Sequence, residues 1–216
     1  MCFNISINKS KDAIAKQFNA VFELDVSFEP QKHISAFTNP LIPVITSESR
    51  NKIQLYHWGL IPEWAKDIKI ANKIRKMTYN AKYETIKEKP SFRNLIKDRK
   101  CLIIADGFYE WQSTSTGKIC HFIKYPKNEI FTFAGIWSEW LNKKTGGFIK
   151  SVSIITQPAN KIMAQIHNVK NRQPVILHEG NRYKWLDAGL NYNKIFDESF
   201  NIRITNKIIK SPLKYK

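Results

Sequence analysis

The most reactive pair of groups in this sequence lies at its start, where Cys2 follows the initiator methionine. The small side chain of cysteine favours loss of Met1, which would leave a free α-amine beside the Cys2 thiol. The reference pKa is about 7.7–8.0 for the amine and about 8.5 for the thiol, so both have nucleophilic fractions near neutral pH. A 1,2-aminothiol condenses with an aldehyde to an imine, and its thiolate then closes a five-membered thiazolidine. Because many proteins begin with Met-Cys by chance, this pair alone is weak evidence for function.

Three other segments carry side chains that could transfer protons or orient a substrate. Glu110 lies between two aromatic residues, and such surroundings raise a carboxylate pKa and suit it to acid or base catalysis. The alternative is an exposed glutamate on the polar face of a strand. His167 lies between a helix end and a strand, and is either a catalytic or a structural histidine. Asn80 and Lys82 place an amide and a cation on one short turn.

Charge and aromatic content indicate the kind of partner. The chain has 35 Lys+Arg against 18 Asp+Glu, a formal net charge of +17, which favours a polyanion such as nucleic acid. A solvated basic surface is the alternative. Trp58 and Trp64 lie at or beside the basic run 66–76, and aromatic residues interleaved with cations suit single-stranded nucleic acid. A core strand followed by a solvated helix would give the same pattern.

The hydrophobic content of 43% is typical of a globular chain. The sequence has neither the long apolar run of a membrane helix nor the features of a signal peptide, so we expect a soluble intracellular protein. Cys2, Cys101 and Cys120 are odd in number and widely spaced, which predicts reduced thiols. The pair Cys120-His121 is a weak metal motif, and we expect no metal site.

The hydrophobic pattern predicts one α+β domain over 1–216, in which consecutive strands form the sheet and helices lie at its periphery. Ser10 is expected to cap a first helix that carries Ile14 and Phe18 on one face. The basic tail 203–216 either follows phosphates or is a frayed end. The expected strands are 53–60, 101–105, 107–112, 121–125, 130–137, 148–156 and 174–177. The other expected helices are 79–87, 91–97, 158–166 and 181–187.

These motifs occur together in an order that resembles the SRAP family, whose name means SOS-response-associated peptidase. Its animal member is the embryonic-stem-cell-specific protein first described as a 5-hydroxymethylcytosine binder. The resemblance covers 1–187, and DGFYEW after NAKYET is its most specific part. It rests on the Met-Cys start and on WGLIPEWAKD (58–67), NAKYET (80–85), ADGFYEW (105–111), FAGIW (133–137) and IHNVKNRQPVIL (166–177).

The resemblance implies a curled, mostly antiparallel, barrel-like sheet and a basic channel for single-stranded DNA or a single-strand/duplex junction. It implies that Cys2, exposed by autocatalytic removal of Met1, cross-links to the aldehyde of a ring-opened abasic site and shields that site from strand cleavage. Asn80 matches the asparagine that holds the sugar, and Glu110 and His167 match the family's acidic residue and histidine. We expect a cytoplasmic, nucleoid-associated monomer that needs no metal or organic cofactor. The expected DNA contacts are Trp58, Trp64, Lys66, Lys73, Arg75, Lys76, Lys82 and Arg172.

The sequence departs from the family pattern in places that bear on substrate preference more than on chemistry. Lys82 stands where the family usually has arginine, which keeps the charge but loses the bidentate fork. Phe3 and Asn4 stand in place of glycine and arginine, and Ile104 in place of proline. The stretch between His167 and Pro174 is longer than in many relatives.

Three alternatives from other functional classes stay open. A cysteine peptidase acting in trans would pair Cys2 with His167 and turn over unrelated peptides. A passive single-strand binder would not need Cys2. An abasic-site lyase would form a Schiff base on a lysine such as Lys82, nick the DNA and be trapped by borohydride.

Overall fold

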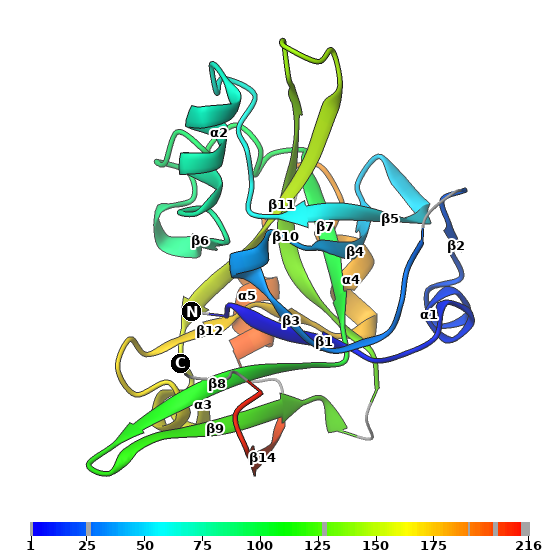
Figure 1. Cartoon of the computed structure of the whole chain (residues 1–216). Coiled ribbons are helices and arrows are strands. Elements are labelled where there is room, and N and C mark those ends of the chain that lie inside the picture. The colour runs from blue at the N-terminus through cyan, green and yellow to red at the C-terminus, as the bar shows by residue number, and fades with distance from the viewer. Residues whose placement is uncertain (1, 25–26, 127–128, 190, 201–202, 213–216) are drawn as a thin grey trace.

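A closed five-stranded barrel is the centre of the computed structural model, which describes residues 2–24, 27–126, 129–189, 191–200 and 203–212 (Figure 1). Its strands follow the order β11-β10-β7-β4-β5, and the parallel pairing of β11 with β5 closes the ring. The other pairs within the ring are antiparallel. The barrel strands are β4 (Leu41–Thr46), β5 (Ser49–Trp58), β7 (Lys100–Ala105), β10 (Phe131–Leu141) and β11 (Phe148–Pro158).

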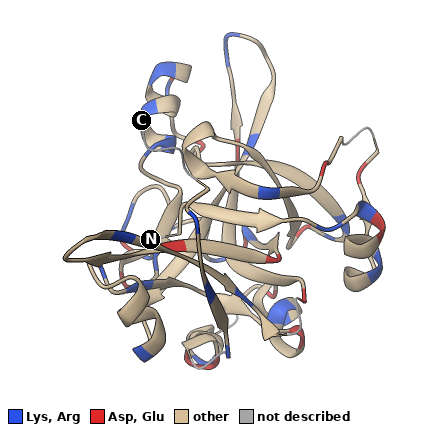
Figure 2. Cartoon of the chain, turned by 60° about the horizontal axis from the view of Figure 1, so that its bottom comes forward, with Lys and Arg blue, Asp and Glu red and all other residues tan. Residues whose placement is uncertain are grey.

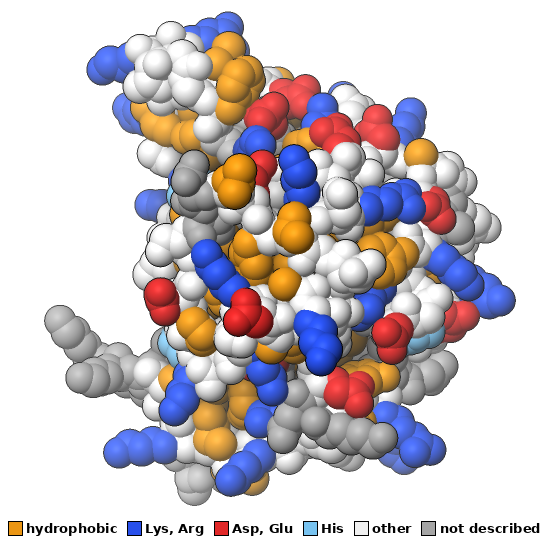
Figure 3. All heavy atoms as spheres, turned by 90° about the vertical axis from the view of Figure 1, so that its right-hand side faces the viewer, with side chains coloured by type: hydrophobic (Ala, Val, Ile, Leu, Met, Phe, Trp, Pro, Cys, Tyr) orange, Lys and Arg blue, Asp and Glu red, His pale blue; other side chains and the backbone are white. Residues whose placement is uncertain are grey.

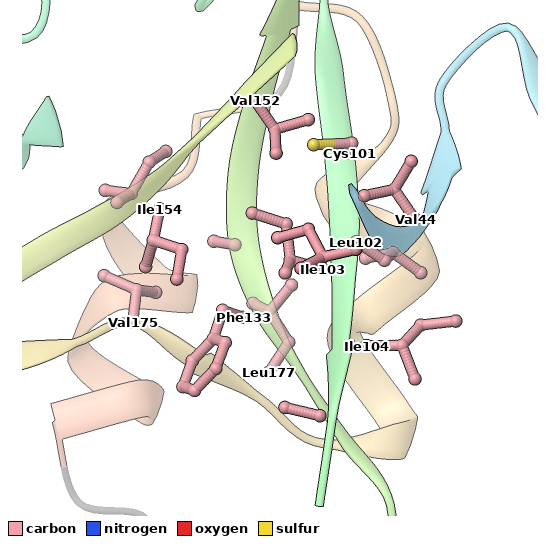
Figure 4. Packing of buried hydrophobic residues seen from close by; sticks show 14 of the residues in the cluster. Val44, Cys101, Leu102, Ile103, Ile104, Phe133, Val152, Ile154, Val175 and Leu177 are labelled. Carbon is pink, nitrogen blue, oxygen red and sulfur yellow. The ribbon is translucent and has the colours of Figure 1, made fainter. Parts of the chain in front are cut away.

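The barrel interior is filled by the apolar runs that the sequence marks as strands. Every residue of β7 is buried, and after Lys100 the strand carries the continuous apolar run 101–105 instead of an alternating pattern. Figure 4 shows Cys101 and Ile103 of this strand among side chains from β4, β10 and β11. Cys101 is therefore a packing residue, with a free and buried thiol.

A second sheet of five strands, all paired antiparallel, brings the start of the chain to the candidate site. Its order is β14-β9-β8-β1-β3. The pairing of β1 with β8 places Ile5 opposite Phe108 and Ser6 opposite Gly107. The residues just before β1 therefore run alongside the segment that contains Glu110. The strands are β1 (Asn4–Ile7), β3 (Gln31–Ser35), β8 (Gly107–Thr114), β9 (Gly117–Lys124) and β14 (Thr205–Ile209).

Helices and short strands surround the two sheets (Figure 1). Ser10 caps the first helix, as predicted, and its side chain accepts a hydrogen bond from the Ala13 N–H. The helices are α1 (Lys11–Phe18), α2 (Ile68–Arg75), α3 (Lys161–Ile166), α4 (Glu179–Trp185) and α5 (Asn193–Phe200), with 3₁₀ turns at Ala36–Thr38 and Tyr83–Thr85. The short strands are β2 (Val21–Phe22), β6 (Asn80–Lys82), β12 (Arg172–Pro174) and β13 (Ile176–Leu177).

The predicted α+β class and the curled sheet with peripheral helices are confirmed, whereas several local predictions were wrong. The expected helix 79–87 is strand β6 followed by a 3₁₀ turn, because 80–82 pairs in parallel with β11. Turns replace the expected helix at 91–97. Pro158 ends β11 instead of starting a helix, and Asn160 caps α3. In the tail, 205–209 forms the edge strand β14, and 213–216 lies outside the described residues.

Two further properties concern the described part of the chain as a whole. It contains no helix that is long and apolar enough to cross a membrane. Cys2, Cys101 and Cys120 are all free thiols, as the sequence predicts.

Gly135 of the FAGIW motif tests how tightly the barrel is packed. A Cβ atom there would lie 2.7 Å from Ile103 Cδ1 and 2.8 Å from Cys101 Sγ. We therefore expect Gly135→Ala to lower the free energy of unfolding by about 1–3 kcal/mol, the usual cost of overpacking a core. Gly147→Ala adds the same methyl group at an ordinary van der Waals distance, 3.6 Å from Thr145 Oγ1, and should change the free energy of unfolding by less than about 0.5 kcal/mol. Equal effects of the two variants in urea unfolding would contradict this description of the interior.

Candidate active site

The four residues that the sequence singles out for chemistry come from four separate segments and meet in one buried cluster. Cys2 precedes β1, Asn80 begins β6, Glu110 lies in β8, and His167 is the C-terminal cap of α3. All four are at least nine-tenths buried. Met1, whose removal the sequence predicts, lies outside the described residues.

Asn80 fixes the backbone of the nucleophile. Its Nδ2 donates a hydrogen bond of 2.9 Å to the Cys2 carbonyl oxygen, whereas its buried Oδ1 accepts no hydrogen bond from the described residues. The Cys2 thiol lies 4.0 Å from the Asn4 carbonyl oxygen. Asn80 therefore orients the main chain at Cys2 and keeps one acceptor for another group.

Glu110 and His167 are two titratable side chains of the cluster that face each other. Their Oε2 and Nε2 atoms are 3.9 Å apart. Both the backbone N–H and the carbonyl oxygen of Arg172 lie 3.1 Å from His167 Nδ1, so this nitrogen either accepts from the N–H or donates to the carbonyl, according to the tautomer. When Nδ1 accepts this hydrogen bond, the proton of the neutral imidazole resides on Nε2 and points toward Glu110.

Burial shifts the pKa values of all three titratable groups toward their neutral forms. Desolvation raises the pKa of Glu110 to about 7 and lowers that of His167 to about 4. Burial, and then the nearby Glu110 charge, raise the pKa of the Cys2 thiol far above its ordinary value. At neutral pH the site thus holds a thiol, a neutral imidazole and a carboxyl that is about half ionised, so Glu110 can both accept and return a proton.

A groove next to Asn80 combines exposed aromatic surface with cations. This first cavity, of about 700 Å³, is lined by Phe3, Trp64, Asn80 and Phe92 among others, and by Lys76, Lys82 and Lys89, without an acidic residue. Figure 2 shows further Lys and Arg along α2. On the face in Figure 3, by contrast, acidic and basic side chains are interspersed. The groove is therefore suited to a polyanion.

The structure separates the predicted DNA contacts into exposed and buried residues. Trp64 and the four lysines Lys66, Lys73, Lys76 and Lys82 are exposed. Trp58 is fully buried and donates its indole N–H to the Tyr79 carbonyl oxygen, so it packs in the core and offers no ring to a base. The side chains of Arg75 and Arg172 are also buried. All three side chains are buried in this structure, and their predicted contacts with DNA stay predictions.

The pairing of Arg172 with Glu84 is a feature that the sequence did not reveal. The Arg172 guanidinium forms a two-point ion pair with the Glu84 carboxylate and also donates to the Thr156 carbonyl oxygen at 2.7 Å. This anchor holds the backbone N–H that faces His167. Both residues lie in motifs that the sequence analysis singled out, Glu84 in NAKYET and Arg172 in the motif that contains His167. Their pairing could not be predicted locally because the two positions are 88 residues apart.

Among the described residues, no group of three or more His, Cys, Asp and Glu side chains is arranged to hold a metal ion. The Cys120-His121 pair instead lies in strand β9, where His121 Nε2 contacts the Gln112 side-chain oxygen at 3.1 Å.

The barrel, the buried cluster around Cys2 and the adjoining basic groove define a barrel protein with a buried cysteine beside a carboxyl and an imidazole near the start of its chain. Residues 1–204 match the family described as SOS response associated peptidase (SRAP), and the chain belongs to this family. The abasic site processing protein YoqW of Bacillus subtilis is 36% identical over 189 residues, which cover 87% of this chain and 80% of the relative. The abasic site processing protein HMCES of Gallus gallus is 33% identical over 150 residues, covering 60% of this chain and 44% of the relative.

Solved structures agree with this assignment. A crystal structure of a protein from Bacteroides thetaiotaomicron has a TM-score of 0.88 at 34% identity, and the match covers 97% of this chain and 92% of that one. A protein from Bordetella bronchiseptica has a TM-score of 0.79 at 22% identity, covering 97% of this chain and all of the other. The second likeness supports the fold alone.

The raised pKa of Glu110 makes stability depend on pH. The unfolded carboxyl ionises more readily than the folded one, so the free energy of unfolding should fall as pH rises from about 4.5 through about 7. Glu110→Gln removes this contribution, which is at most about 3 kcal/mol for a shift of this size. Urea unfolding at pH 5 and pH 8 measures this effect. Between these two pH values, we expect the free energy of unfolding of the variant to fall by about 1–3 kcal/mol less than that of the wild type. Exposed Glu63→Gln is the control, and should keep the wild-type pH dependence.

Proposed function

We propose that this protein captures abasic sites in single-stranded DNA by forming a thiazolidine between Cys2 and the ring-opened sugar aldehyde. The observation that carries this proposal is the buried cluster of Cys2, Asn80, Glu110 and His167, of which Asn80 lines a groove that also contains lysines and Trp64. The relatives named as abasic site processing proteins support it.

The first step is removal of Met1 by the chain itself. Glu110 in its ionised form takes the proton of the Cys2 thiol, and the thiolate attacks the carbonyl carbon of Met1. The C–N bond breaks as a thioester forms, and Glu110 returns the proton to the departing nitrogen, which becomes the α-amine. Water then hydrolyses the thioester and releases methionine. A carboxyl with a pKa of about 7 suits both proton transfers.

Capture of the aldehyde uses both groups of the freed Cys2. The amine adds to C1′ of the open sugar, and Glu110 supplies the proton with which the carbinolamine loses water. The Cys2 sulfur then bonds to the imine carbon, and its proton passes to the nitrogen, so amine, thiol and aldehyde give thiazolidine and one water. Closing the ring removes the imine that would drive β-elimination, and the DNA strand stays intact.

Asn80 is proposed to position the sugar, and His167 is proposed to assist the opening of the cross-link. The free acceptor Asn80 Oδ1 is available to a sugar hydroxyl while its Nδ2 holds the Cys2 carbonyl. His167, with its Nε2 facing Glu110, can protonate the thiazolidine when the cross-link opens again. Neither residue requires a metal or organic cofactor.

Intact mass spectrometry tests the proposal directly. The protein is measured before and after incubation with a single-stranded oligonucleotide that carries one abasic site. We expect a chain that lacks Met1 and a heat-resistant adduct with the mass of protein plus DNA minus one water. Cys2→Ala should form no such adduct, and Glu110→Gln should slow its formation about 10²–10⁴-fold, the usual contribution of a general acid–base group. Retention of Met1, or DNA binding without an adduct, would favour a passive binder.

Lys82 tests the path of the DNA along the groove. A lysine that neutralises one phosphate of a single strand contributes about 0.7 to the slope of log K against log salt concentration. We expect Lys82→Ala to reduce that slope by about this amount, measured by fluorescence anisotropy with an undamaged oligonucleotide. Lys143→Ala, on the exposed turn between β10 and β11, should leave the slope unchanged. A slope that is the same in wild type and Lys82→Ala would place the strand elsewhere.

A further inference from the structure

Three aromatic rings from distant segments form a rigid cluster beside Cys2. The Phe3 and Phe37 rings lie 5.1 Å apart at an angle of 31°, and the Tyr79 ring meets both edge-on at 6.1 and 5.8 Å. Tyr79 is buried, whereas Phe37 is 61% exposed. The cluster therefore packs Phe37 against Phe3 and Tyr79 while leaving much of its ring open to solvent.

Phe37 faces a second cavity, distinct from the groove described above. This cavity of about 310 Å³ is lined by Phe3, Phe37, Glu110, Trp111, His167 and Lys170 among others, with Lys118 also at its wall. Phe3 lines both the first and the second cavity. The catalytic pair thus opens toward the second cavity, while Asn80 opens toward the first.

The chemistry of the second cavity fits a nucleotide. Phe37 offers a ring face, on which any nucleobase can stack, and Lys118 and Lys170 offer charge to a phosphate. The indole N–H of Trp111 is buried and has no acceptor among the described residues. A base carbonyl, a ring nitrogen or a phosphate oxygen would supply that acceptor.

We propose that the second cavity binds the nucleobase directly adjacent to the abasic site, stacked on Phe37, so that capture is faster beside a purine. This inference rests on the proposed function, because the strand must place its sugar aldehyde at Cys2. The strand enters along the groove, passes over Phe3 and continues into the second cavity. A purine is favoured over a pyrimidine since it covers more of the exposed ring.

Cross-linking rates with varied neighbours test the inference. Oligonucleotides carry one abasic site and, on its 5′ or its 3′ side, adenine, thymine or a baseless tetrahydrofuran spacer. At protein concentrations below saturation, the wild type should react about 5-fold or more faster with adenine than with the spacer on one of the two sides, and thymine should fall between. Phe37→Ala should lose this dependence on the neighbour while still forming the adduct.

Phe148→Ala is the matched control. Phe148 is 62% exposed at the start of β11, in the strand pair that projects from the barrel in Figure 1, and lines neither cavity. This variant should keep the wild-type dependence on the neighbouring base. An unchanged dependence in Phe37→Ala, or none in the wild type, would overturn the inference.

A second readout is independent of covalent chemistry. A 2-aminopurine is placed beside a tetrahydrofuran site, which cannot react with Cys2, and its fluorescence is followed during titration with protein. Stacking on Phe37 should quench the wild-type signal at saturation on the same side that accelerates capture, and Phe37→Ala should show little quenching. Quenching without any adduct would support the base site and refute the proposed capture reaction. Adduct formation without quenching would support the capture reaction and refute the base site.

Discussion

The antiparallel pairing of β1 with β8 is the contact on which the site depends. It sets the residues after Cys2 in register with the DGFYEW strand, so that the nucleophile at the start of the chain meets a carboxylate more than a hundred residues away. The same pairing buries both groups and removes water from them. Desolvation then raises the pKa of Glu110 to about 7. The pairing of β1 with β8 therefore both brings Cys2 next to Glu110 and raises the pKa of Glu110.

In the proposed reaction, the electrostatics of the cluster favour Glu110 as the group that transfers protons. The Cys2 thiol is held protonated by burial and by the nearby carboxylate, so it needs a base at the moment of attack. His167 stays neutral at pH 7 because burial lowers its pKa to about 4. A buried carboxylate costs stability and persists where function uses it, which is the general reason why perturbed pKa values gather at active sites.

Chemistry and affinity are built from different parts of the molecule. The reacting groups lie in a buried centre fixed by backbone contacts, such as the hydrogen bond from Asn80 to the Cys2 carbonyl. The exposed lysines and aromatic rings surround this centre in two cavities that share Phe3. In the proposed mechanism, substrate preference can therefore change at Phe37 or Lys82 without altering Glu110 and His167.

The sequence by itself determined four of the five barrel strands and the residues whose side chains could do chemistry, whereas it predicted no strand at Leu41–Thr46, which forms β4. Apolar runs such as 101–105 predict strands locally, and Cys2, Asn80, Glu110 and His167 stand in recognisable motifs. Only the tertiary structure decided which aromatic and basic residues are exposed, because alternating rings and cations fit a core strand and a binding surface equally well. Trp58 proved to be core. The tertiary structure also decided that 80–82 is a strand and that Arg172 pairs with Glu84, since both features depend on partners far along the chain.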